Sequence, residues 1–555
     1  MQEVTPTRSL TRRQAALALA GLGVGSVVFQ RALAAQAESK DVSSEMIQQA
    51  EWIAGIELDD EDRARVASRL RRARRGLKAL RSVELENGAP PATVFSPIAK
   101  PPVRQRTRRA PKKHFEPKWT LPEVTKPDSD VDLAYLSVAE QASLLHSRQI
   151  SSVELTKLSL ERLKAHDPKL LCVVNLTERT ALEQAERADQ EIAAGRYRGP
   201  LHGIPWGAKD LVAYPGYPTT WGAPQYKDRV IDQKATVARK LEEAGAILVA
   251  KLSLGALAMG DRWFRGMTRN PWDPEQGSSG SSAGSASAVA AGLVSFAIGS
   301  ETYGSIVSPC TRCGTTGLRP TFGRVSRTGC MTLSWSLDKV GPIARSVEDC
   351  SLIFSAIHGP DPEDPATVVR PFDPRSNSLS ELRVGYFEGD DAESIGVLKK
   401  LGVQLVPIQL PKAPIGGLLR ILDVEAAAAF ESLTRSGDDQ GIGVWPDYFR
   451  AGHLTSAVDY VRAQRVRRQL MTAMERATES VDVWVDTRRR DLAITNLTGH
   501  PSVVLPRGFR KDGDVARPLS IVFSGQLHGD ADVLAIADAY QRRTGHHKKR
   551  PPQFS

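Results

Sequence analysis

The chain contains little cysteine. Its 555 residues include only Cys172, Cys310, Cys313, Cys330 and Cys350. So few cysteines, odd in number, define no disulfide framework and would leave at least one thiol free in an exported protein. Cys310 and Cys313 lack the further ligands of a structural zinc site, so we expect buried thiols there.

Cofactor signatures are also missing. The sequence has no metal-ligand spacing, no phosphate-binding loop, no dinucleotide fingerprint and no internal repeat. We therefore expect neither a metal nor an organic cofactor. The composition, 41% hydrophobic and 25% charged, is that of a globular protein long enough to bury a sizeable core.

Long apolar runs are scarce, and the one that stands out lies at the start of the chain. Arg12 and Arg13 precede the apolar stretch 15–29, and Ala32-Leu33-Ala34 follows it. This order is typical of a twin-arginine export signal, and the stretch is shorter than the roughly 20 residues of a spanning helix. We predict a signal over residues 1–34, cleaved after Ala34, and a periplasmic or secreted protein. An uncleaved anchor is the lesser alternative, and we expect membrane contact through this signal only.

Residues 35–89 form a basic, helical extension in this interpretation. Asp59 and Asp60 are a helix-start signal, and the apolar side chains that follow share one face of a helix, at Val66, Leu70, Ala73, Leu77 and Leu80. Arginines occupy the other face. Such a face can bind a membrane or nucleic acid, but a solvated face on a packed helix is the commoner outcome, so we expect no nucleic-acid partner. Residues 90–127 are proline-rich and predict an extended connector.

Three later segments carry groups that could perform catalysis. Ser305 follows Gly304 closely after an apolar run, Ser281 lies in the glycine-serine stretch 280–286, and Lys209 ends the segment 203–209. A serine hydroxyl is a weak nucleophile until a base takes its proton, and lysine can be that base without histidine. The lysine must then be uncharged, which burial in an apolar pocket favours. Glycine-serine stretches alone are more often linkers.

Together these segments resemble the amidase signature family. Ser279 to Ala286 is similar to the family's glycine-serine run, and Ser281 precedes Ser305 by the family's interval of 24 residues. The resemblance implies a catalytic triad of Ser305, Ser281 and Lys209. It also implies a cis peptide bond between Gly280 and Ser281, with Gly280 and Ser282 as the supporting loop.

The resemblance further implies an oxyanion hole. Its donors would be the backbone N–H groups of Thr302, Tyr303, Gly304 and Ser305. Two residues depart from the family pattern: Tyr303 stands in place of a glycine, and Val307 in place of an arginine. Tyrosine resists positive φ, so either the loop accepts both residue types or its donor geometry differs.

The fold expected is α/β, with a single large mixed β-sheet covered on both faces by helices and a helical N-terminal extension. Residues 235–252 predict a helix, a stop at Gly245 and a buried strand, and such alternation favours this class. A helix over 285–291 and a strand over 293–298 should place Ser305 just past a strand end. We place the catalytic domain at 128–555. The resemblance is strong over 131–360, including 317–320 and 338–342, becomes weaker over 361–480 and returns at 496–501.

Other residues invite functional interpretations that we do not favour. His202 precedes Lys209 closely, but a hydrogen-bonded structural histidine is the better interpretation because the base is already present. Trp445, Tyr448 and Phe449 lie where the family shapes its substrate pocket, but core packing is the safer expectation for each.

The functional prediction is an exported amidase that hydrolyses carboxamide C–N bonds of a small-molecule amide through an acyl-enzyme. The first alternative is the glutaminase component of a tRNA-dependent amidotransferase, which the same resemblance allows. The second is a non-catalytic binding protein on the same scaffold, prompted by Tyr303. The sequence leaves a homodimer open.

Overall fold

The computed structural model describes residues 42–84, 92–93, 119–373, 379–513 and 515–555. These residues form two compact units, which are described separately. The predicted export signal lies outside the described residues, as does most of the proline-rich connector. Among the residues described, none of the helices combines the length and the hydropathy that a bilayer crossing needs.

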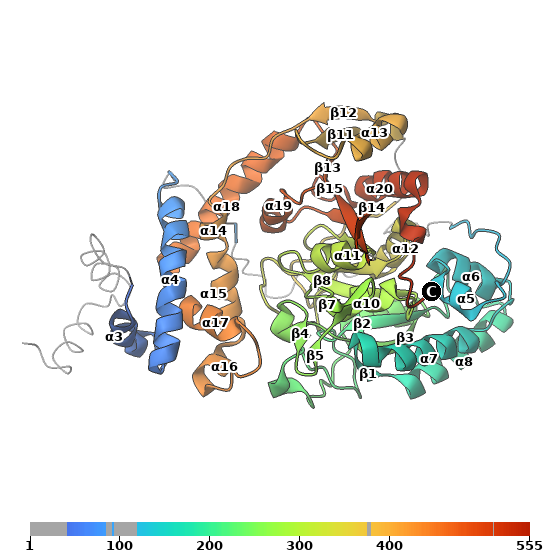
Figure 1. Cartoon of the computed structure of the whole chain (residues 1–555), viewed down its shortest axis with the longest axis horizontal. Coiled ribbons are helices and arrows are strands. Elements are labelled where there is room, and N and C mark those ends of the chain that lie inside the picture. The colour runs from blue at the N-terminus through green and yellow to red at the C-terminus, as the bar shows by residue number, and fades with distance from the viewer. Residues whose placement is uncertain (1–41, 85–91, 94–118, 374–378, 514) are drawn as a thin grey trace, which may run out of the picture. The chain divides into compact units, whose positions relative to one another are not determined.

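The larger unit is built on one mixed sheet of eleven strands in the order β1-β3-β2-β8-β10-β9-β14-β15-β13-β11-β12 (Figure 1). β2 runs parallel to both β3 and β8, whereas β8, β10, β9 and β14 follow one another in antiparallel pairs. The strands are β1 Val173–Leu176, β2 Pro205–Lys209, β3 Ile247–Leu252, β8 Phe296–Glu301, β9 Thr316–Arg319, β10 Lys339–Ala344, β11 Arg383–Tyr386, β12 Gln404–Pro407, β13 Val483–Asp486, β14 Ser502–Asp512 and β15 Val515–Gly525. Two short ribbons add β4 Arg262–Trp263 with β5 Gly266–Met267, and β6 Arg269–Asn270 with β7 Asp273–Gly277.

Helices cover both faces of this sheet, as the sequence predicted. They are α5 Asp130–Tyr135, α6 Val138–His146, α7 Ser152–Leu170, α8 Glu178–Ala193, α9 Thr236–Glu243, α10 Ala283–Ala290, α11 Val307–Cys313, α12 Val347–Ile357, α13 Ala392–Lys400, α19 Leu492–Thr498 and α20 Asp530–Thr544. Capping boxes start α6 at Ser137 and α7 at Ser151, because each serine and the glutamate three residues later bond one another's backbone N–H. The core between the layers is aliphatic and includes Ile247, Val249, Ala297 and Ile343.

One predicted strand is displaced along the chain. The apolar run 293–298 indicated the strand, but β8 begins at Phe296 and ends at Glu301. Leu293 instead completes the end of α10, where its N–H bonds the carbonyl of Ala288. Hydrophobicity alone cannot separate a buried helix end from a buried strand, so the boundary was misplaced by about one helical turn.

The smaller unit is helical and joins two distant parts of the chain. It contains α3 Ser44–Ala54, α4 Asp60–Arg81, α14 Ile415–Leu418, α15 Arg420–Ala429, α16 Glu431–Ser436, α17 Trp445–His453 and the first part of α18 Ala457–Thr478. The sequence had placed the later helices within the catalytic domain. α4 and α14 approach closely where Gly76 meets Gly416 and Gly417, since a Cβ on Gly76 would lie 2.8 Å from the carbonyl carbon of Gly416.

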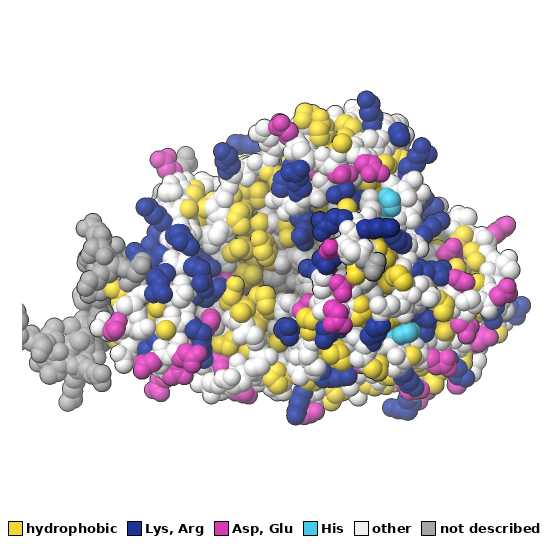
Figure 2. Space-filling view, viewed as in Figure 1, with side chains coloured by type: hydrophobic (Ala, Val, Ile, Leu, Met, Phe, Trp, Pro, Cys, Tyr) yellow, Lys and Arg dark blue, Asp and Glu magenta, His cyan; other side chains and the backbone are white. Residues whose placement is uncertain are grey.

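The arginine-rich helix of the smaller unit has the two faces that the sequence predicted. Val66 and Leu80 are fully buried, while Lys and Arg side chains gather over the surface of α4 (Figure 2). Gly55 ends α3 in a left-handed conformation, and α4 begins at Asp60 with Asp59 as its N-cap, where the sequence predicted a helix start. Trp445 and Phe449 are fully buried and stacked, and Arg69 lies over the ring of Tyr448, so these aromatic residues pack within this unit.

Candidate active site

Lys209 is the last residue of β2, and its side chain is completely buried. Its Nζ lies 2.8 Å from the Oγ of Ser281, 3.1 Å from the Oγ of Ser282 and 2.9 Å from the Oγ of Ser300. Burial lowers the pKa of Lys209 to about 7, because the ammonium form loses its hydration and nearby carboxylates only partly offset that loss. A large share of the amine is therefore uncharged near neutral pH and has a lone pair that can accept a proton.

The serine loop supplies the partner of this amine. The peptide bond between Gly280 and Ser281 is cis, as the resemblance implied, and Ser281 is 1% exposed. Ser282 accepts from Lys209 and donates its own Oγ–H to the carbonyl of Ser300 at 3.1 Å. The loop is thus attached to the end of β8 through Ser282 and to β2 through Lys209.

Ser305 lies four residues beyond the end of β8 and is 9% exposed. Its carbonyl accepts the backbone N–H of Ser282 at 3.1 Å, so the loops that carry Ser281 and Ser305 are joined directly. In the part of the chain that the structure describes, the Ser305 hydroxyl itself makes no hydrogen bond. Catalytic hydrogen bonds are often long in a free enzyme and shorten when substrate binds.

The loop between β8 and α11 accepts tyrosine without strain. Gly304 has φ +87°, while Tyr303 is absent from the described residues with positive φ. The replacement of glycine by Tyr303 therefore leaves the backbone in a region open to any residue. The Tyr303 side chain is 40% exposed and points out of the packed core.

A buried ion pair that the sequence did not predict holds this loop. One carboxylate oxygen of Glu301 accepts the N–H groups of Ile306 and Val307 at 2.8 and 2.9 Å. The other accepts a guanidinium N–H of Arg319 at 2.7 Å and the side-chain amide of Asn496 at 2.8 Å. Burial alone raises the pKa of Glu301, but Arg319 and the backbone donors outweigh it and bring the pKa down to about 2.

A second buried pair lies beside the lysine. Asp210 follows Lys209 in the chain, and its carboxylate lies 2.6 Å from the Nζ of Lys251, with both side chains completely buried. Its other oxygen accepts the N–H of Thr220 at 2.8 Å. Both pairs join residues far apart in sequence, so no local spacing signal pointed to them.

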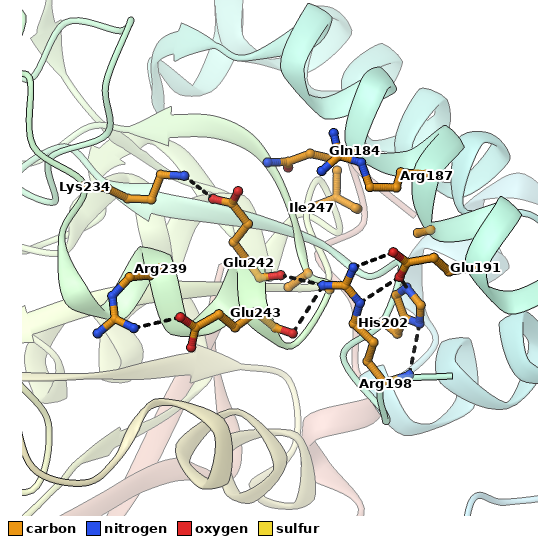
Figure 3. A pocket seen from close by; sticks show the side chains of 13 residues that line it. Gln184, Arg187, Glu191, Arg198, His202, Lys234, Arg239, Glu242, Glu243 and Ile247 are labelled. Atoms are coloured by element: carbon orange, nitrogen blue, oxygen red, sulfur yellow. Dashed lines mark hydrogen bonds and ion pairs between the residues drawn. The ribbon is translucent and has the colours of Figure 1, made fainter. Parts of the chain in front are cut away.

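His202 is a structural residue, as the sequence predicted. It is 1% exposed, its Nδ1 accepts the N–H of Arg198 at 3.2 Å, and its Nε2 lies 3.2 Å from a carboxylate oxygen of Glu191. These partners hold the ring beside a pocket of about 230 Å³ (Figure 3). That pocket lies next to Ile247, at the start of β3, whereas Lys209 lies where the parallel strand β2 ends, so the pocket is separate from the candidate active site.

The comparisons with known proteins agree with this geometry. A family model described as Amidase matches residues 154–498. A glutamyl-tRNA(Gln) amidotransferase subunit of Carboxydothermus hydrogenoformans is 31% identical over 489 residues, covering 76% of this chain and all of that protein. The chain belongs to the amidase family, whose signature the three segments carry.

Solved structures give the same result. The native peptide amidase of Stenotrophomonas maltophilia is 29% identical, covers 77% of this chain and all of its own, and has a TM-score of 0.68. An amidase family protein of Bacillus anthracis is 26% identical, covers 76% of this chain and 94% of its own, and has the same TM-score. The sequence resemblance and the predicted fold class are both confirmed.

Proposed function

We propose that this protein is an exported amidase that hydrolyses carboxamide C–N bonds through an acyl-enzyme. The observation that carries the proposal is the position of Lys209. Its fully buried amine, with a pKa of about 7, lies 2.8 Å from the hydroxyl of Ser281. An uncharged amine in that position can accept a proton from a hydroxyl.

In this mechanism Ser305 attacks the carbonyl carbon of the amide. Its proton passes to Ser281, whose own proton passes to Lys209. The oxyanion that forms on the substrate accepts hydrogen bonds from the backbone N–H groups of residues 302–305. The relay then returns a proton to the amine as the C–N bond breaks. Water attacks the acyl-enzyme, aided by the same groups, and releases the carboxylic acid and free Ser305.

Substitution of Ser305 tests this assignment. Ser305→Ala should abolish amide hydrolysis and labelling by a fluorophosphonate probe while the protein remains folded by circular dichroism. Ser308→Ala is the matched control, because it removes a hydroxyl three residues further along the same segment and should keep the label. Amide hydrolysis that persists in Ser305→Ala would refute the proposed nucleophile. If the parent protein neither hydrolyses amides nor reacts with the fluorophosphonate probe, the non-catalytic alternative is favoured.

The second candidate is the glutaminase component of a tRNA-dependent amidotransferase. It is favoured by the 31% identity to a glutamyl-tRNA(Gln) amidotransferase subunit over that protein's whole length. Such a component works with partners in the cytoplasm, whereas residues 1–34 predict export. Cell fractionation separates the two candidates. The exported amidase is supported if the parent protein leaves the cytoplasm and the R12K/R13K variant stays there. The glutaminase is supported if the protein is found in the cytoplasm in a complex with other amidotransferase components. Sedimentation of the purified protein would test whether it forms a homodimer.

A further inference from the structure

Three large apolar side chains are exposed on the segments that build the candidate active site. Met259 is 36% exposed, Tyr303 40% and Trp335 52%. By contrast, Ser281 and Ser305 are at most 9% exposed. Exposed aromatic and apolar side chains around an otherwise buried polar site are typical of a ligand-binding surface.

Tyr303 and Trp335 lie on two segments that meet at a single carboxylate. One oxygen of Asp338 accepts the hydroxyl of Thr302 at 2.6 Å, and the other accepts the N–H groups of Leu333 and Ser334 at 2.8 and 2.9 Å. Tyr303 directly follows Thr302, and Trp335 directly follows Ser334. The half-buried carboxylate thus fixes the positions of both aromatic residues relative to the loop that carries Ser305.

Met259 belongs to a segment that packs against the serine loop. It precedes Gly260, whose carbonyl oxygen packs so tightly on Gly280 that a Cβ there would lie 1.9 Å away. The following residue, Asp261, accepts the N–H of Ser279 at 2.8 Å. The segment that exposes Met259 is therefore anchored to the loop of Ser281.

We propose that Tyr303, Trp335 and Met259 bind the acyl group of the substrate, and that this acyl group is large and apolar, either aromatic or a long alkyl chain. This inference rests on the proposed amidase function. Tyr303 belongs to the loop that would bind the substrate carbonyl, so its ring lies beside the group attached to that carbonyl. Aromatic rings favour apolar and aromatic partners, whereas a glutamine substrate would bring a charged amino-acid group to this surface.

Ammonia release from four primary amides tests the inference, because the leaving group is the same in each. The purified enzyme is assayed with acetamide, hexanamide, phenylacetamide and L-glutamine. We expect kcat/KM for phenylacetamide and hexanamide to exceed that for acetamide by about 100-fold or more, since each buried methylene contributes about 10- to 200-fold. Trp335→Ala should reduce this preference about tenfold, mainly through a higher KM for phenylacetamide and hexanamide.

Two further variants make the test specific. Trp335→Phe should restore most of the preference, because it restores an aromatic ring. Trp52→Ala removes a tryptophan that is 59% exposed on α3, and should leave the preference unchanged. An unchanged preference in Trp335→Ala would overturn the role of that ring.

The two proposals fail in different ways. If acetamide or glutamine is the best substrate, the inference about the acyl group is overturned and the amidase function stands. If none of the four amides is hydrolysed and Ser305 is not labelled by a fluorophosphonate, the proposed function itself is wrong, and the inference falls with it.

Discussion

The two units differ in how completely their ion pairs are buried. In the smaller, helical unit, Glu431 and Arg435 form a pair within α16 with about half of each side chain exposed, and even its more buried carboxylate, Asp423, pairs with arginines that keep some exposure. In the catalytic unit, the pairs Asp210–Lys251 and Glu301–Arg319 are completely buried. An exposed pair is screened by water and contributes little, whereas a buried pair that loses one partner leaves a charge that water cannot reach.

The location of the buried pairs explains their use. Asp210 directly follows Lys209, and Glu301 ends the strand that leads to Ser305. Each pair therefore fixes the backbone next to a residue of the proposed triad. We infer that the two completely buried pairs of the catalytic unit position the site, while an exposed pair such as Glu431–Arg435 mainly keeps a surface solvated.

The largest effect is expected at the buried amine. Lys209→Met should lower kcat/KM for amide hydrolysis by about 10⁴-fold or more, because the proton acceptor is lost while the space is filled. Initial rates with the best of the primary amides above measure this change in kcat/KM. Lys157→Met, which removes an exposed lysine of α7, should leave the rate unchanged. A loss below tenfold in Lys209→Met would exclude the lysine as the base.

Glu301→Gln should have the next largest effect. It leaves Arg319 buried without its carboxylate, so we expect the free energy of unfolding to fall by about 3–5 kcal/mol. Urea denaturation at pH 7 measures it. The folded pKa of Glu301, about 2, lies below its ordinary 4.5, so its contribution is fully present above pH 4.5 and is lost as pH falls toward 2. The difference between parent and variant should therefore shrink at pH 3; a constant difference would contradict the ion-pair explanation.

The pH dependence of the rate is the third prediction. Only uncharged Lys209 can accept a proton, and its pKa is about 7, so kcat/KM should rise with pH through about 7 and then level off. Below the pKa the rate should fall about tenfold for each pH unit. A pH–rate profile between pH 5 and 9 measures this, and a flat profile over that range would contradict the assignment.

The smallest effect is expected from the same substitution in the helical unit. Glu431→Gln removes one partner of an exposed pair, so the free energy of unfolding should change by less than about 0.5 kcal/mol and the rate not at all. Urea denaturation measures the free energy of unfolding, and initial rates measure the activity. A loss as large as that of Glu301→Gln would remove the distinction drawn between this exposed pair and the buried pairs of the catalytic unit.

The sequence predicted the parts of the site that local pattern encodes. Lys209, Ser281 and the cis bond before it could be predicted because each lies in a short segment that resembles the family, and the structure brings Lys209 and Ser281 together. Helix starts at Ser137 and Ser151 could be predicted because the capping residues are three positions apart.

What the sequence did not predict depends on long-range contacts. Arg319 and Asn496 fall in segments that resemble the family, yet their approach to Glu301 joins residues up to 195 positions apart. The pairing of the first helices with residues 414–466 likewise has no local signal. The strand before Ser305 was misplaced because an apolar run does not reveal where a helix end gives way to a strand.

The joining of α4 with helices that begin more than 300 residues later has a consequence during synthesis. Leu80 packs against Gly417, where an added Cβ would lie 2.7 Å from its own, so Leu80 must wait for a partner that the ribosome has not yet made. At roughly 5–20 residues per second, the 337 residues from Leu80 to Gly417 take about 17 to 67 s. For this interval the nascent chain presents an uncovered apolar stripe, so a chaperone that shields such stripes should raise the yield of folded protein, and a chain ending before residue 414 should aggregate.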